Sequence, residues 1–135
     1  PDCDKSGVAV IETPAGLWLQ NLSFFELFDF LNHWEFVIKT VVVEAGYLNK
    51  GNWHTFSGDK AKYAASIGKR TGANHEVARK IVEMLEYLKI PYSTVKPQRT
   101  KLNHADFIKT AKQRGYTDLP KRTNAETRDA AMLII

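Results

Sequence analysis

Three carboxylates carry the chemistry that this sequence suggests. Glu126 and Asp129 stand three residues apart in the segment Asn-Ala-Glu-Thr-Arg-Asp-Ala-Ala, which begins at Asn124. Residues spaced i, i+3 lie on the same side of a helix, so these two side chains point in one direction. Glu44 directly follows three valines, more than 80 residues earlier. Because an unpaired charge is costly in a core, we expect Glu44 at an accessible site rather than in core packing.

A strand-end carboxylate that faces an acidic helical pair makes an oxygen-rich, strongly negative pocket. Such ligands suit Mg²⁺ or Mn²⁺. The pattern therefore predicts a metal site formed by Glu44, Glu126 and Asp129, of the kind that hydrolyses phosphodiesters. The alternative for the helical pair is that acids in a first turn oppose the helix dipole, which explains Glu126 better than the deeper Asp129. Asp2 and Asp4 are expected in a turn, with Asp4 a weaker candidate for a substitute ligand.

Size and composition describe an ordinary globular protein. The 135 residues fit one domain, and 19 Lys and Arg against 15 Asp and Glu give a net charge of +4. That excess permits contact with a polyanion without requiring it. The single cysteine, Cys3, excludes an internal disulfide and fits a reducing cytoplasm. No run of 18 apolar residues occurs, so a membrane role is not expected.

The chain alternates strand and helix patterns. β-branched and apolar runs predict strands at residues 7–13, 17–22, 36–44 and 91–97. Helical periodicity predicts helices at residues 23–32, about 60–88, 104–114 and from 124 onward. This order predicts an α/β fold with a mixed sheet flanked by helices. Glu44 would then lie at the carboxyl edge of the sheet, where α/β proteins usually bind ligands.

Several local features refine these elements. Ser23 can cap the first helix, whose apolar face is predicted to hold Phe24, Leu27, Phe28 and Leu31. The near-continuous apolar run of residues 36–44 predicts a strand buried on both faces. Residues 60–88 form one helix or two, with a restart at Asn74, and either Thr123 or Asn124 caps the last helix.

Three ordered stretches resemble the RuvC-like Holliday junction resolvases of the ribonuclease H-like superfamily. The opening Pro1-Asp-Cys-Asp-Lys-Ser-Gly-Val-Ala-Val resembles the segment after the family's first strand. Val41-Val-Val-Glu44 resembles the central strand that ends in a metal-binding Glu, and Glu126-Thr-Arg-Asp129-Ala-Ala resembles the terminal acidic pair. Two departures stand out: the family's first catalytic Asp would precede Pro1, and Glu126 replaces a more usual Asp.

The resemblance implies one ribonuclease H-like nuclease domain over residues 1–135, with its first strand missing and both ends truncated. It also implies a homodimer that cuts branched DNA such as Holliday junctions, in DNA recombination and repair. Glu44, Asp129 and the Asp before Pro1 would hold two Mg²⁺ ions about 4 Å apart, and Glu126 would complete their ligands. Lys101 would oppose the negative charge that builds on the phosphate.

Basic residues mark possible contacts with DNA. Lys96, Arg99 and Lys101 follow the strand at residues 91–97, where phosphate contact competes with an ordinary solvated loop. Lys60, Lys62, Lys69 and Arg70 lie on the outer half of a helix, and either follow a DNA backbone or are plain surface residues. Tyr47, Trp53 and Phe56 either stack on an unpaired base or pack their own loop.

Two rival functions remain open from the sequence. One is a nucleic-acid-binding module of the same fold without catalysis, in which the acids serve charge or helix capping. The other is a nuclease for RNA or RNA–DNA hybrids, because the superfamily uses similar sites for both.

Overall fold

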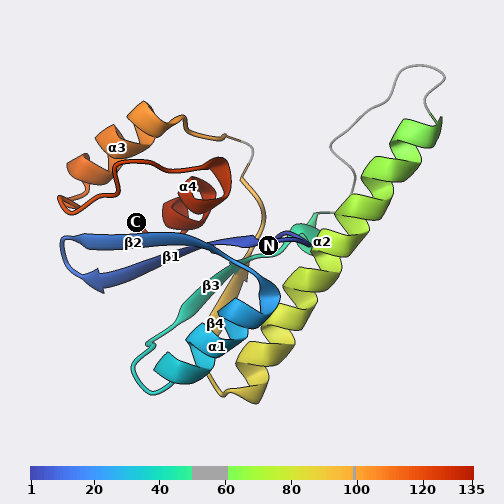
Figure 1. The fold of residues 1–135 in the computed structure, drawn as a ribbon, viewed down its shortest axis with the longest axis horizontal. Helices are drawn as coiled ribbons and strands as arrows, with labels where there is room; N and C mark the ends of the chain where they lie inside the picture. Colours follow the sequence, from blue (N-terminus) through green and yellow to red (C-terminus); the bar gives the residue numbers. More distant parts are fainter. Residues whose placement is uncertain (50–60, 99) are drawn as a thin grey trace. The chain divides into compact units, whose positions relative to one another are not determined.

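The computed structural model describes residues 1–49, 61–98 and 100–135. These residues form a mixed α/β protein with two two-stranded sheets and four α-helices (Figure 1). They divide into two compact units. The parallel-sheet unit comprises Pro1–Cys3 and Phe30–Pro97, and the hairpin unit comprises Asp4–Asp29 and Gln98–Ile135. A single domain over the whole chain stays a prediction.

The hairpin unit is built on two antiparallel strands, β1 (Ser6–Thr13) and β2 (Gly16–Leu22). The turn between them is held by the Gly16 N–H, which donates to Thr13 Oγ1 at 2.9 Å. Ala9 lies opposite Leu19 in the register. Both pack against the core of this unit, because alternate residues of a strand share one face. Both strands predicted from the β-branched and apolar runs are confirmed.

Two helices cover that face of the hairpin (Figure 1). They are α3 (His104–Gln113) and α4 (Ala125–Met132). Phe107 and Ala111 of α3 and Ala131 of α4 are fully buried, and they form one cluster with Leu17 of β2. The Asp106 N–H donates to the side chain of Asn103 at 2.9 Å, which caps the start of α3. Both helices occur where the sequence predicted them.

α4 approaches β1 unusually closely at Gly7. A Cβ atom placed on Gly7 would lie 2.2 Å from the backbone oxygen of Glu126. Real Cβ atoms essentially never come that near, and the obstacle is backbone rather than a flexible side chain. The glycine is therefore required for the start of α4 to lie against the strand.

The parallel-sheet unit pairs β3 (Val41–Glu44) with β4 (Tyr92–Val95). α2 (Ala61–Tyr87) is one continuous helix, which settles the question of a restart at Asn74. The buried residues of its second half repeat every three or four positions, as an amphipathic helix requires. They are Ala78, Ile81, Met84 and Leu85. No helix in the described ranges is long and apolar enough to cross a membrane.

The predicted strand at residues 36–44 is wrong over its first half. The N–H groups of Val37 and Ile38 donate to the carbonyl of Trp34 at 3.0 and 3.1 Å. These bonds continue the end of α1 (Phe24–Trp34) as a turn, so the strand begins only at Val41. Phe36 is 94% exposed. Burial on both faces is also wrong, because Val43 is the one fully buried residue of β3.

α1 begins with the predicted cap at Ser23. The Glu26 N–H donates to Ser23 Oγ at 3.4 Å, and the Ser23 N–H donates to Glu26 Oε2 at 2.7 Å. The hydrogen bond from the Ser23 N–H to the carboxylate, the Ser23 hydroxyl and the positive charge of Lys5 lower the pKa of Glu26. Leu27 and Leu31 are buried as predicted, whereas Phe24 is exposed.

Replacing Gly7 by alanine should destabilise the hairpin unit, because the added methyl group must push α4 away from β1. We expect the free energy of unfolding to fall by about 1–3 kcal/mol in chemical denaturation. Gly68→Ala is the matched control, since nothing lies within 4 Å of a Cβ there and the residue is exposed on α2. That control should gain about 0.5–1 kcal/mol. Equal effects of the two variants would contradict the close approach.

Candidate functional site

Glu44 ends β3 at the carboxyl edge of the parallel pair. It lies opposite Val95 in the register, and the N–H of Ala45 donates to the Val95 carbonyl at 2.8 Å. Because parallel strands run in the same direction, Lys96 leaves β4 at the edge where Glu44 leaves β3. Glu44 is half-buried and Lys96 is exposed. The predicted position of Glu44 at this edge is confirmed.

The chain after Glu44 is held against α2 by two aromatic contacts. A Cβ at Gly46 would lie 2.8 Å from the imidazole of His75, so this backbone passes directly against the ring. The guanidinium of Arg79 lies 4.9 Å from the centre of the Tyr47 ring, a cation–π contact. Neither contact could be predicted from the sequence, because each joins positions about 30 residues apart.

The acidic pair of the last helix is placed by a reciprocal cap. The Thr127 N–H donates to Asn124 Oδ1 at 2.9 Å, and the Asn124 N–H donates to Thr127 Oγ1 at 3.3 Å. Asn124, rather than Thr123, is therefore the N-cap. Thr127 and Ala131 are the buried residues of α4, so they mark the side of the helix that faces the core. Glu126 is consequently exposed in the first turn, while Asp129 is half-buried one turn further on.

Lys101 and Asp129, two predicted site residues, are in direct contact. Lys101 Nζ lies 2.7 Å from Asp129 Oδ2. The lysine side chain is 66% exposed and that of the aspartate 22%. An ion pair so open to water contributes less than about 1 kcal/mol to stability. The contact is informative for its position, because it brings a cation onto the carboxylate that was predicted to bind a metal.

Sequence reasoning missed Arg128, which lies beside Asp129 on α4. Its Nε donates to the Leu102 carbonyl at 2.8 Å, and its Nη1 donates to the carbonyl and hydroxyl of Thr123 at 3.0 and 3.2 Å. Two of these acceptors are backbone carbonyls. Every residue has one, so the residue types do not show which carbonyl Arg128 binds.

The remaining predicted residues fall into two groups. Lys69 and Arg70 are exposed on α2, where contact with a DNA backbone stays a prediction. Lys60, Arg99, Trp53 and Phe56 lie outside the described residues.

Glu44 belongs to the parallel-sheet unit, whereas Glu126, Asp129 and Lys101 belong to the hairpin unit. The meeting of the three carboxylates in one cavity therefore stays a prediction.

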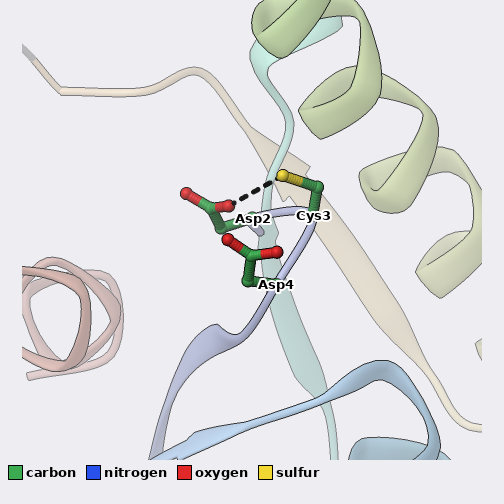
Figure 2. Close-up of side chains that lie close together, drawn as sticks. All are labelled: Asp2, Cys3 and Asp4. Atoms are coloured by element: carbon green, nitrogen blue, oxygen red, sulfur yellow. Dashed lines mark hydrogen bonds between the residues drawn. The ribbon is translucent and has the colours of Figure 1, made fainter.

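The N-terminal Asp2, Cys3 and Asp4 have side chains that gather closely (Figure 2). Their potential ligand atoms lie within 4.8 Å of one another, and Cys3 Sγ donates to Asp2 Oδ1 at 3.3 Å. The Cys3 N–H donates to Asn74 Oδ1 at 3.0 Å, and the chain bends at Cys3 and Asp4. Cys3 and Asp4 are exposed, and exposed acidic groups are common without an ion. This cluster is therefore not evidence for a metal site.

Comparisons of the chain with protein-family models, with curated proteins and with solved structures found no match.

Removing the charge of Lys101 should leave the fold nearly unchanged. We expect Lys101→Met to change the free energy of unfolding by less than about 1 kcal/mol, because the ion pair is exposed. The exposed Lys121 of the same unit provides the control, as Lys121→Met. Chemical denaturation of both variants checks this. A loss of several kcal/mol for Lys101→Met alone would show that the lysine is a structural residue.

Proposed function

We propose that this protein is a metal-dependent endonuclease with a ribonuclease H-like fold, and that it cuts branched DNA such as a Holliday junction. The proposal includes a homodimer, as expected from the resemblance to the RuvC-like resolvases.

The observation that carries the proposal is the contact of Lys101 with Asp129. The half-buried aspartate would bind a metal ion through its carboxylate, and the ammonium group, now 2.7 Å away, would turn to the phosphate once the ion is bound. Glu126 lies three residues before Asp129 on the same helix. Glu44, at the carboxyl edge of a parallel pair, has the placement that α/β folds favour for ligands.

The donor set fits a hard divalent cation. Glu44, Glu126 and Asp129 offer only carboxylate oxygens, which Mg²⁺ and Mn²⁺ prefer over nitrogen or sulfur ligands. These residues would hold the ions. Such ions, when bound, supply Lewis acidity at a scissile phosphate and a strong nucleophile at neutral pH.

The side chains of this protein would bind and orient the DNA. The ammonium of Lys101 lies beside Asp129, where it would offset the charge of the phosphate in the transition state. Lys96, Lys69 and Arg70 are exposed, and they would contact phosphates away from the cut. These contacts read no base, so they fit an enzyme that recognises the shape of its DNA.

A nucleic-acid-binding module without catalysis is the second candidate. It is favoured by Glu126, which is exposed in the first turn of α4, where an acid stabilises the helix dipole without any metal. The two candidates differ in their response to metal ions, which the following experiments measure.

Millimolar Mg²⁺ or Mn²⁺ should raise the melting temperature, because the ions relieve repulsion among the carboxylates and bind only the folded protein. Asp129→Asn should reduce that rise. The exposed Asp118 of the same unit supplies the control, as Asp118→Asn, which should keep the full rise. Equal rises in all three proteins, measured by scanning calorimetry, would mean that Asp129 is not a ligand.

Cleavage should require both the acids and the metal. The assay uses four-way, forked and linear DNA, with Mg²⁺ or with EDTA, and the protein with whatever residues its gene encodes ahead of Pro1. We expect cutting of branched DNA that Glu44→Gln or Asp129→Asn lowers by more than about 100-fold, with DNA binding retained. Binding without any cutting by the unsubstituted protein would favour the second candidate. Preferential cutting of RNA–DNA hybrids would reassign the substrate.

A further inference from the structure

Arg128 ties two separate backbone segments to α4. One segment is residues 100–103, which have no regular secondary structure and lead into α3. The other is Thr123, which precedes the cap of α4. The guanidinium donates to the Leu102 carbonyl and to both oxygens of Thr123, over 2.8 to 3.2 Å. Thr123 Oγ1 in turn lies 2.9 Å from Nδ1 of His104, the first residue of α3.

This arrangement anchors the residue next to Lys101. Leu102 packs its side chain on the core of the hairpin unit, and Arg128 binds its carbonyl. Lys101 is one peptide away, and its ammonium reaches Asp129, the neighbour of Arg128 on the helix. Two consecutive residues of α4 therefore bind two consecutive residues of this segment. Arg128 binds the carbonyl of Leu102, and Asp129 binds the side chain of Lys101.

The contacts of Arg128 are of a stronger kind than the ion pair of Lys101. An exposed ion pair is weak, and the entropy lost in fixing a lysine side chain opposes it. The pair therefore depends on how well the backbone that carries Lys101 is placed. Hydrogen bonds from a charged guanidinium are stronger, and Arg128 is half-buried.

We propose that Arg128 is a positioning residue, which fixes Leu102 and thereby holds the Lys101 ammonium beside Asp129. Lysine cannot replace it, because one ammonium on a flexible stem cannot present the planar fork that binds both segments. The role of Lys101 in cleavage rests on the proposed function, whereas the placement of its ammonium does not.

The first test uses the protein without metal or DNA. Relaxation of the ¹⁵N nucleus in the Lys101 ammonium reports how tightly that group is held. We expect Arg128→Lys to reduce its order to that of the exposed Lys121, while amide spectra keep the folded pattern. The control Arg122→Lys, at an exposed arginine of the same unit, should leave Lys101 unchanged. Undiminished order in Arg128→Lys would overturn the proposal.

A milder variant guards against loss of folding. Thr123→Val removes one acceptor of Arg128 and keeps the shape of the side chain, so it should reduce the order of Lys101 partially. No change in Thr123→Val, with Arg128→Lys unfolded, would assign Arg128 a purely structural role.

The second test uses cleavage of four-way DNA. Arg128→Lys should lower kcat by about 10- to 100-fold and change KM by less than about twofold, because misplacement of Lys101 affects the reaction more than binding. An unchanged kcat would overturn the proposal. If the unsubstituted protein cuts no DNA, the proposed function fails, and the NMR experiment still decides whether Arg128 positions Lys101.

Discussion

The contact of α4 with β1 is the constraint on which the candidate site depends. A helix of 8 residues has little stability of its own, so its position comes from its cap and from burial against the hairpin. Asn124 supplies the cap, and Gly7 leaves the room for the helix backbone. That placement then sets the position of each candidate site residue on α4. Glu126 faces water, Asp129 is half-buried, and Arg128 reaches back to the segment that carries Lys101.

The second constraint is the parallel pairing of β3 and β4. Parallel pairing requires a long crossover connection, and here the connection includes α2. Both strands then end at one edge, which places Glu44 and Lys96 at the carboxyl edge of the pair. The contacts of His75 and Arg79 with the following residues attach this edge to the helix. A carboxylate at such an edge is available to a ligand without the cost of full burial.

Much of this architecture could be predicted from local patterns. The apolar runs of β1 and β2, the cap of α1 at Ser23 and the placement of Glu44 each follow from a few neighbouring residues. The strand expected at residues 36–40 was wrong because its aromatic and β-branched composition competes with hydrogen bonds to Trp34, and a short apolar run does not reveal which prevails. The Arg128 contacts could not be predicted, since two acceptors are backbone carbonyls. The contact of Lys101 with Asp129 joins residues 28 positions apart, and only the packing of α4 brings them together.

The central claim is that Glu44 binds the same ions as Glu126 and Asp129. Paramagnetic broadening by substoichiometric Mn²⁺ tests it directly, because broadening reports which amides lie close to a bound ion. The account predicts that amides around Glu44 and around Asp129 broaden together at the same Mn²⁺ concentrations, and that Asp129→Asn weakens the effect at both. Broadening at one of these places alone, or only at Asp2, Cys3 and Asp4, would contradict a shared site.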